Sequence, residues 1–419
     1  MGGVRGALVV QLLGRCDGAD ARRRDRDPFS AHVFRDGKLG GNLSSGQDKA
    51  HAADVMRLDR DQLSVTMPAP RREWLSLLDR DANATIYQTP EWLDAICRSE
   101  AYEDTSRHYE TAAGRQCVLP VVRRRLYGGL AIEESMPSAW GMGGLVAAEP
   151  VDVDDLRLIW SDLRSNSHAR LRVRDSNLGR GLPVNGDQRE PLSVIWETKH
   201  VLDLRQGFDS VYTKSFNRTT RKNLRRAESA GVEVECDSSG RLVPIYYELY
   251  RSWVMRRAAE RNLPTSLMLH RARSRESLRK FHVLAELLNG SSKIWVAWWK
   301  GEPIAAMIGL SYKSRAFAFR SYSNMDLANS VRANDLLHHC MIEDACRAGC
   351  LSYNMGGSGG VPGLMAYKAK FGAVAVDFPV YTIETFPFKQ ISQSWERLNF
   401  MTRALAGRWR PRIATSPDS

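Results

Sequence analysis

The chain has 419 residues, 43% of them apolar, and a formal net charge of +12 from 60 Lys and Arg against 48 Asp and Glu. This length fits two or three domains, and the apolar fraction excludes a wholly disordered chain or a small disulfide scaffold. No stretch offers about 18 uninterrupted apolar residues, so we expect no transmembrane segment. The closest run, Ile294 to Tyr312, is interrupted by Lys300, Glu302 and Pro303.

The beginning of the chain differs in composition from the rest. We expect residues 1–55 to be a disordered extension, because they contain an arginine run, the Gly/Ser stretch 40–46 and little hydrophobic periodicity. The apolar stretch Ala7–Leu13 is barely long enough for a secretory signal, so export is not favoured. Met56 opens a more ordinary sequence, and a natural start at this residue stays open.

The next elements give a first, faint α/β unit. Glu91–Ser99 is predicted to be a helix, and His108–Thr111 with Gln116–Val122 a hairpin around Gly114.

The second half repeats this order more clearly. A helix over Val211–Ala230 and a strand over Val232–Cys236 come first, and two further helices are expected near residues 245–253 and 278–288. Three strands with short turns then predict an antiparallel meander at 294–299, 304–312 and 316–322. A helix with Leu337, Met341 and Ala345 on one face and a strand at 350–354 follow. The fold class is therefore α/β, an α+β mixed sheet, built from two related units.

The cysteines and histidines point away from a metal or a disulfide framework. The seven cysteines are odd in number and form no CxxC, which favours free thiols in a reducing, cytoplasmic compartment. Cys340, Cys346 and Cys350 lie near His338 and His339, but their spacing matches no common zinc module, so we expect no metal site.

Several motifs together resemble FemAB-like acyltransferases of the GNAT superfamily, the relatives of the peptidoglycan bridge aminoacyltransferases. The segment Lys214-Ser-Phe-Asn-Arg-Thr-Thr-Arg-Lys-Asn-Leu-Arg-Arg-Ala-Glu228, before a Gly and a short strand, is similar to the entry motif of that family. The other matches, in chain order within about residues 90–385, are Leu119-Pro120, Ser135-Met136-Pro137, Gly143-Gly144, Trp298–Ala305, Asn354–Gly359 and Tyr367–Gly372.

This resemblance implies two tandem GNAT-like domains, at 67–200 and 201–385, before a basic amphipathic helix and tail at 386–419. It also implies that no cofactor is tightly bound and that acyl-CoA or aminoacyl-tRNA is the donor substrate. One departure concerns the donor pyrophosphate loop, which in this fold usually reads Gln/Arg-x-x-Gly-x-Gly/Ala. The stretch Asn329–Asp335 has no glycine, which puts the usual mode of acyl-CoA binding in doubt.

A cationic helix is the first candidate binding element. Arg218, Lys222 and Arg225 fall at i, i+4 and i+7 with Arg221 adjacent, so four cations share a face. A facing phosphate would offset their mutual repulsion. Contact with a phosphate and a merely solvated face both remain open.

Lys368 and Asp335 are the expected catalytic residues. The resemblance suggests that Lys368 meets a substrate phosphate or the reacting carbonyl, where a cation stabilises a developing oxyanion. Asp335, His338 and His339 are candidates for the proton acceptor that attack by an amine requires, and a nucleophile at Cys340 or Cys350 is a weaker alternative. The remaining expected substrate-binding residues are Tyr322, Gly356, Gly357, Tyr367 and Phe371.

Two rival interpretations concern the last hundred residues. Gly356–Gly360 after a strand, with a further strand ending at Asp377, is a weak match to a dinucleotide-binding motif. The helical stripe from Ile391 to Leu405 predicts a helix that packs on the protein itself, or else a membrane-surface helix.

We therefore expect an N-acyltransferase that moves an acetyl or aminoacyl group onto an amine of an anionic, phosphorylated cell-envelope or polysaccharide precursor. The expected partners are a phosphorylated or lipid-linked small molecule, a tRNA, and the inner face of the membrane through peripheral contact. The alternative is a non-catalytic or nucleic-acid-binding module that uses the basic helix 214–226.

Overall fold

The computed structural model describes residues 62–126, 130–165, 169–175 and 193–384. The extension expected at 1–55 and the amphipathic helix and tail expected at 386–419 lie outside the described residues.

The first unit runs from residue 63 to residue 174. Its elements are β1 (Leu63–Thr66), α3 (Arg71–Arg80), η1 (Ile86–Gln88), α4 (Pro90–Ser99), β2 (Glu103–Asp104), β3 (Arg107–Thr111), β4 (Gln116–Leu119), β5 (Val122–Arg125), β6 (Ala131–Ser135), η3 (Ser138–Trp140), β7 (Val146–Ala147), α5 (Val153–Ser165) and β8 (Arg170–Arg174).

The second unit runs from residue 193 to residue 384. Its elements are β9 (Ser193–Asp203), α6 (Phe208–Ser210), η4 (Val211–Ser215), α7 (Arg218–Ser229), β10 (Glu233–Asp237), α8 (Val243–Glu260), α9 (Thr265–Arg275), α10 (Leu278–Leu287), β11 (Ser292–Trp299), β12 (Glu302–Tyr312), β13 (Arg315–Ser323), α11 (Met325–Val331), α12 (Ala333–Arg347), β14 (Ser352–Gly357), α13 (Pro362–Ala369) and β15 (Val374–Glu384).

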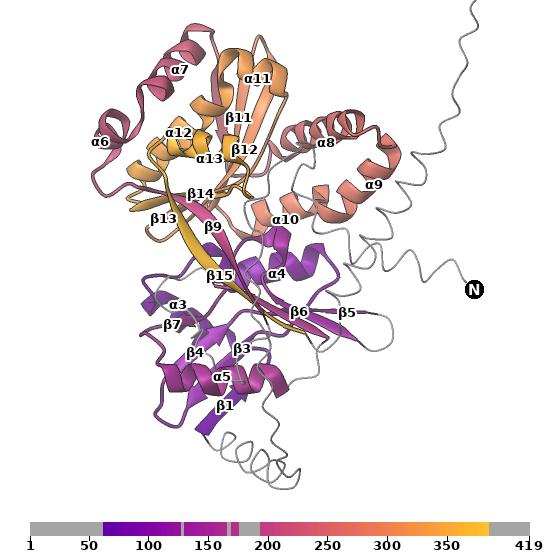
Figure 1. The fold of residues 1–419 in the computed structure, drawn as a ribbon, viewed down its shortest axis with the longest axis vertical. Coiled ribbons are helices and arrows are strands. Elements are labelled where there is room, and N and C mark those ends of the chain that lie inside the picture. The colour runs from indigo at the N-terminus through magenta and orange to yellow at the C-terminus, as the bar shows by residue number, and fades with distance from the viewer. Residues whose placement is uncertain (1–61, 127–129, 166–168, 176–192, 385–419) are drawn as a thin grey trace, which may run out of the picture.

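One large mixed sheet joins the two units. Its eleven strands have the order β10-β11-β12-β13-β14-β9-β15-β8-β6-β5-β2, and a separate four-stranded sheet has the order β1-β3-β4-β7. The long strands β9 and β15 run between the units in Figure 1. Strand β15 pairs with β9 on one side and with β8 of the first unit on the other. The last described strand of the chain therefore completes the sheet of the first unit.

Both units show the same local succession of elements. In the first unit, β5 and β6 pair antiparallel, α5 follows, and β8 returns parallel to β6. In the second unit, β12 and β13 pair antiparallel, α11 and α12 follow, and β14 returns parallel to β13. Every other ladder between described strands is antiparallel. The predicted meander and the two related α/β units are confirmed.

The single helix predicted over Val211–Ala230 is wrong at one point. The structure has a π-helical turn, η4, then a break with extended backbone at Phe216, and only then α7. The Asn217 side chain accepts a hydrogen bond of 2.8 Å from the backbone N–H of Thr220. Asparagine is among the strongest N-cap residues, so it starts a new helix where hydrophobic periodicity alone suggested continuity.

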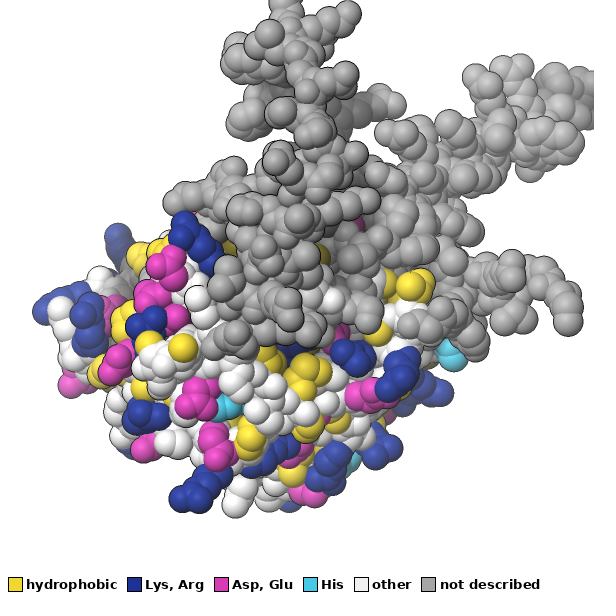
Figure 2. Space-filling model, turned by 90° about the horizontal axis from the view of Figure 1, so that it is seen from below, with side chains coloured by type: hydrophobic (Ala, Val, Ile, Leu, Met, Phe, Trp, Pro, Cys, Tyr) yellow, Lys and Arg dark blue, Asp and Glu magenta, His cyan; other side chains and the backbone are white. Residues whose placement is uncertain are grey.

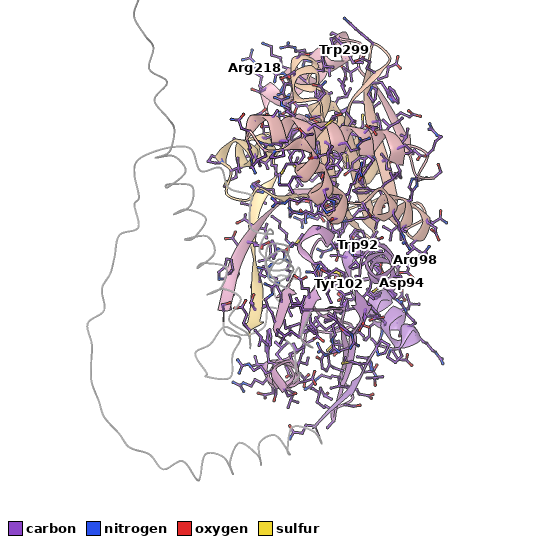
Figure 3. The ribbon with its side chains drawn as sticks, turned by 90° about the vertical axis from the view of Figure 1, so that its right-hand side faces the viewer. Trp92, Asp94, Arg98, Tyr102, Arg218 and Trp299 are labelled. Atoms are coloured by element: carbon purple, nitrogen blue, oxygen red, sulfur yellow. The ribbon has the colours of Figure 1, made fainter. Side chains whose placement is uncertain are left out.

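The main hydrophobic core lies where the two units meet. Trp92 of α4 packs edge-to-face on Trp140 at 5.7 Å and on Phe319 of β13 at 5.3 Å, and Tyr87 packs on Phe317 at 5.0 Å. Figure 3 places Trp92 at this boundary, with Arg218 and Trp299 at the opposite end of the second unit. A second core lies between the other face of the sheet and helices α7 and α12. The units are therefore fused through apolar surface as well as through strand pairing.

A buried ion cluster crosses the same boundary. Glu276 lies 3.0 Å from the Nζ of Lys280 and 3.2 Å from the guanidinium of Arg320, and the side chains of Glu276 and Lys280 are 6% and 1% exposed. Both cations also donate to the carbonyl oxygen of Ala139 in the first unit, at 3.0 and 2.8 Å. The Lys280 ammonium lies 4.0 Å from the ring centroid of Trp140.

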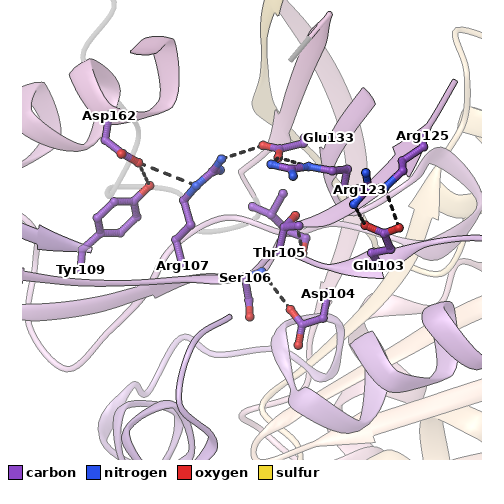
Figure 4. A network of polar contacts seen from close by, with 11 residues as sticks. Glu103, Asp104, Thr105, Ser106, Arg107, Tyr109, Arg123, Arg125, Glu133 and Asp162 are labelled. Carbon is purple, nitrogen blue, oxygen red and sulfur yellow. Dashed lines mark hydrogen bonds and ion pairs between the residues drawn. The ribbon is translucent and has the colours of Figure 1, made fainter. Parts of the chain in front are cut away.

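The first unit contains a second buried charge network, which Figure 4 shows. The side chains of Arg107 and Glu133 are fully buried and 2.7 Å apart, and Arg123 pairs with the other carboxylate oxygen of Glu133. Asp162 accepts a hydrogen bond of 2.9 Å from the phenol of Tyr109. These charges compensate one another, so they are suited to holding β3, β5, β6 and α5 together.

Candidate active site

The parallel strands β13 and β14 separate within the second unit. Their register covers only Arg315–Ser352 to Phe317–Asn354, although β13 continues to Ser323 and β14 to Gly357. Beyond this point the two strands are no longer paired with one another. We call this opening the β13–β14 fork. A fork in a sheet exposes backbone N–H and C=O groups that an extended ligand can use as a further strand would.

The corresponding place in the first unit is filled by the chain itself. There β6 and β8 are parallel from Ile132–Arg170 to Ser135–Val173, and the next pair is a bridge between Gly143 and Asp175. The N–H of Gly143 donates to the carbonyl of Arg174 at 2.9 Å. A Cβ on Gly143 would lie 2.3 Å from the Ser135 hydroxyl, so only glycine fits. The second unit is the one with an open fork.

Lys368 of α13 lies at the Gly-rich end of β14. Its Nζ donates to the carbonyl oxygens of Gly356 and Gly357 at 2.8 and 2.7 Å. The residue is 5% exposed, and burial lowers the pKa of its ammonium to about 8. An ammonium has three N–H donors, so one remains for a ligand. The structure thus brings three of the expected site residues together.

Aromatic rings form the surroundings of this lysine. His338 of α12 lies 5.8 Å from Tyr367 and 5.4 Å from Phe371, measured between ring centroids, and its Nδ1 is 2.9 Å from the phenol of Tyr353. Burial, followed by the charges of Lys368 and Lys370, lowers the pKa of His338 to about 3. His338 is therefore neutral at physiological pH and a weak proton acceptor.

Asp335 lies in the first turn of α12 and is 3% exposed. One carboxylate oxygen is 2.6 Å from the ammonium of Lys370, and the other accepts from the side-chain amide of Asn223 at 2.5 Å. Because both oxygens are occupied, the arrangement favours a residue that positions α7, α12 and α13 over one that accepts a proton.

The basic helix α7 presents most of its cations to solvent. Arg218, Lys222 and Arg225 are exposed, and none of them takes part in an ion pair with another described residue. Arg221 differs, because its guanidinium folds back onto the carbonyl oxygens of Tyr212, Thr213 and Phe216. On the face of the first unit in Figure 2, by contrast, basic and acidic side chains are interspersed. The N-terminal end of α7 abuts the site, because Thr220 donates to the carbonyl of Lys370 at 2.9 Å.

Tyr322 lies on the opposite face of the sheet. Its ring packs against Tyr246, Tyr250 and Trp253 of α8 at 5.6, 4.7 and 5.5 Å. Burial raises the pKa of its phenol. The structure does not bring Tyr322 together with Lys368.

The glycine-free segment Asn329–Asp335 contains the junction between α11 and α12. Arg332 adopts a left-handed conformation with φ of 64° and links α11 to α12. Its Nε is buried without a hydrogen-bond partner among the described residues. The side chain of Asn334 bonds to Ser323 at 3.4 Å, which places the start of α12 beside the end of β13. An arginine thus occupies the junction where the usual donor loop of this fold has a glycine.

Several residues around Lys368 were not predicted. His200 of β9 and Ser358 are both buried, with the His200 Nδ1 3.3 Å from the Ser358 hydroxyl. Burial, and then the charge of Lys368, lowers the pKa of His200. No local pattern links residues 158 positions apart. Lys370 could have been proposed from the sequence, because it lies within the aromatic-Lys-x-x-aromatic-Gly segment.

Other features of the described residues bear on the alternatives. Strand β15 pairs antiparallel with β9 and does not pair with β14, which is incompatible with the parallel βαβ unit of a dinucleotide-binding fold. Within the described ranges, no group of three or more His, Cys, Asp or Glu could hold a metal ion. No helix in the same ranges has the length and apolar character needed to cross a bilayer.

A cavity of about 160 Å³ lies in the first unit, between α3, the β3–β4 hairpin and α5. None of the expected site residues lines it. We place the candidate site at the fork because the convergence of polar groups, and not volume, decides where chemistry can occur.

Comparisons with known proteins bear on the family and on the fold. Residues 214–369 match the family model described as an acetyltransferase (GNAT) domain. The crystal structure of FemX is similar, with a TM-score of 0.52 and 12% identity, over 75% of this chain and 96% of that one. A tandem GNAT protein from the clavulanic acid biosynthesis pathway has a TM-score of 0.45 and 13% identity, over 78% of this chain and 99% of that one. A search of curated proteins gave no match. Residues 214–369 are therefore similar to a GNAT acetyltransferase domain, which supports an acyltransferase, and the chain has a fold like that of FemX.

Proposed function

We propose that the chain transfers an acyl group from acyl-CoA to the amine of an anionic, phosphorylated precursor of the cell envelope or of a polysaccharide. The observation that carries this proposal is the open β13–β14 fork of the second unit, with Lys368 at the Gly-rich end of β14 and the N-terminal end of the basic helix α7 in contact with the segment after α13. The family match to residues 214–369 covers both features.

The reaction needs few groups on the protein. The amine attacks the thioester carbonyl carbon, a C–N bond forms as the C–S bond breaks, and the thiolate leaves and takes up a proton. Negative charge develops on the carbonyl oxygen during attack. The remaining N–H of Lys368 stabilises this charge in a site from which the surrounding Tyr353, Tyr367 and Phe371 exclude water. The proton of the amine leaves through water, because His338 is too weakly basic and Asp335 is engaged by Lys370 and Asn223.

The donor and acceptor have different binding surfaces in this proposal. The extended pantetheine arm pairs with the backbone of the fork, and Arg332 at the start of α12 meets the diphosphate. Arg218, Lys222 and Arg225 attract the anionic acceptor. Nucleic-acid binding through α7 is less favoured, because Phe216 beside it is 1% exposed and cannot stack on a base.

The test uses steady-state kinetics with acetyl-CoA and longer acyl-CoA donors against phosphorylated and unphosphorylated amines. Lys368→Ala should lower kcat by about 100-fold, the usual effect of removing an oxyanion donor. The double variant Arg218→Ala/Arg225→Ala should raise KM for the phosphorylated amine and leave KM for acyl-CoA unchanged.

Lys300→Ala removes an exposed cation from the turn between β11 and β12 and serves as the control. If neither variant differs from this control, the site assignment is refuted. If turnover occurs only with aminoacyl-tRNA, the donor is wrong and the fork retains its role. Lipid-linked and free forms of an active acceptor, compared in the presence of vesicles, show whether a membrane surface contributes.

A further inference from the structure

An exposed apolar stretch lies just before Lys368 in the chain. Residues 359–366 read Gly-Gly-Val-Pro-Gly-Leu-Met-Ala, and every one of them is exposed. The large side chains of this stretch, Val361, Leu364 and Met365, are 45%, 40% and 39% exposed. A Cβ placed on any of its glycines would meet no atom within 4 Å beyond its chain neighbours. The stretch, which we call the apolar tip, includes the start of α13 and projects from the described part of the protein.

The composition of the apolar tip differs from that of an ordinary protein surface. Isolated exposed apolar side chains are normal, but an unbroken run without a polar side chain marks a surface that meets an apolar partner or phase. No acidic residue occurs between Asp344 and Asp377, so the chain on either side of the tip presents no carboxylate to a negatively charged surface.

The helix that carries the apolar tip is held beside the basic helix α7. The backbone N–H of Asn217 and the hydroxyl of Thr220 both donate to the carbonyl oxygen of Lys370, at 2.9 Å in each case. Because α13 rises by 1.5 Å per residue, its first residue lies only about 12 Å from this contact. The exposed cations of α7 begin at Arg218, directly after Asn217. Apolar and cationic surfaces therefore lie close together, in positions that hydrogen bonds fix.

We propose that the apolar tip enters the headgroup region of an anionic lipid bilayer, while the exposed cations of α7 contact the lipid phosphates. Aliphatic side chains next to cations are typical of proteins that lie on a bilayer without crossing it. A nucleic acid would also attract the cations, but it offers no apolar phase in which Leu364 and Met365 could be buried.

Binding of this kind brings the candidate active site to the lipid surface. Lys368 lies in the last turn of the helix that begins with the apolar tip. A lipid-linked acceptor could then reach Lys368 while its lipid part stays in the bilayer. This consequence rests on the proposed function, whereas binding to the bilayer itself does not.

Cosedimentation of the full chain with lipid vesicles, in the absence of any substrate, tests the proposal. The wild type should bind vesicles of equal parts phosphatidylcholine and phosphatidylglycerol, and bind pure phosphatidylcholine less tightly. Leu364→Asp should weaken binding about tenfold or more, the effect of a leucine that is no longer buried. The matched control is Leu267→Asp, which changes a leucine 43% exposed on α9 and should bind as the wild type does.

A pair of charge reversals tests the cationic part. Arg218→Glu/Lys222→Glu should weaken binding to the anionic vesicles about tenfold or more. Arg271→Glu/Arg275→Glu makes the same change in net charge at exposed positions of α9 and should have a much smaller effect.

Three results would overturn the proposal. The first is equal binding to the two kinds of vesicle, and the second is binding that depends on the α9 positions instead of the apolar tip and α7. The third is a dimer in light scattering that Leu364→Asp dissociates, because a second copy of this chain would then be what covers the tip. Since the assay contains no acyl donor, a chain that binds vesicles but shows no turnover contradicts the proposed function alone.

Hydrogen exchange of the wild type does not depend on the folding of a variant. Anionic vesicles should slow exchange in peptides that cover the apolar tip and leave exchange in α9 unchanged. Exchange in the tip that stays the same at saturating lipid, or protection confined to α9, contradicts the proposal.

Discussion

The buried ion cluster between the units makes a quantitative prediction possible. In Glu276→Gln the volume of the side chain is nearly kept, but the negative charge between Lys280 and Arg320 is lost. Lys280 is 1% exposed at its side chain, so its ammonium cannot turn to water. In the variant, the cations Lys280 and Arg320, which share Glu276 in the wild type, face each other across a neutral amide.

The magnitude follows from burial. Removing one partner of a buried ion pair typically costs about 3–5 kcal/mol. The matched control is Glu343→Gln, because Glu343 and Arg347 form another pair in the same i, i+4 order but with side chains 40% and 71% exposed. An exposed pair of this kind contributes about 0.3–0.5 kcal/mol. The two variants should therefore differ roughly tenfold in the free energy of unfolding that they lose.

Urea unfolding followed by tryptophan fluorescence measures both losses. Glu276→Gln should also lower the Tm by about 10 °C. Although burial opposes it, Lys280 and Arg320 lower the pKa of Glu276. The stabilisation is therefore present above the pKa of an unfolded glutamate and lost as pH falls through the lower folded value, and Glu276→Gln removes this acid-dependent part. Equal losses in Glu276→Gln and Glu343→Gln would refute the reasoning.

Two further predictions concern the candidate active site. If Lys368 acts as a cation, the kcat/KM of the wild type divided by that of Lys368→Arg should fall as pH rises through about 8, because only the lysine loses its proton there. The ratio cancels the ionisation of the acceptor amine, which affects both proteins equally. A ratio that rises with pH would identify Lys368 as a general base instead. Gly372 has φ of 87° and a Cβ placed on it would lie 2.7 Å from the Cβ of Ser215, whereas Gly290 has φ of 83° and open space around it. In urea unfolding, Gly290→Ala should lower the free energy of unfolding by about 1 kcal/mol, for its backbone conformation alone. Gly372→Ala should lower it by about 1–3 kcal/mol more, since Ser215 must also move. Equal losses would contradict the close packing of η4 on the segment after α13.

The local part of the fold could be predicted from the sequence. The meander follows from β-branched and aromatic runs separated by short turns, and the turn residues Lys300 and Gly301 both have positive φ. The pairing of β9 with β15 carries no such signal, because it joins residues far apart in the chain. The domain boundary expected between residues 200 and 201 falls inside β9, which pairs with both β14 and β15.

The candidate site could likewise be predicted from the sequence only in part. Lys368 and Gly356 could be proposed from the sequence because each belongs to a short motif, whereas His200 and Asn223 approach the candidate site only through tertiary packing. Helical periodicity placed Arg221 with the exposed cations of α7. Its long side chain instead bonds to backbone carbonyl groups that the break at Phe216 leaves without helical partners. Helical spacing predicts the direction of the Cα–Cβ bond, but not the position of the guanidinium at the end of a long arginine side chain.

The pairing of β15 with β8 has a consequence for synthesis on the ribosome. Arg174 at the end of β8 pairs with Val380 of β15, which lies 206 positions further along the chain. At about 5–20 residues per second, the nascent first unit waits roughly 10–40 s for the strand that closes its sheet. During this interval β8 offers an unpaired edge, at which another chain could pair. Its sequence Arg170-Leu-Arg-Val-Arg174 alternates arginine with apolar residues. Arginine at every second position suits a strand edge that must remain unpaired until β15 has been synthesised.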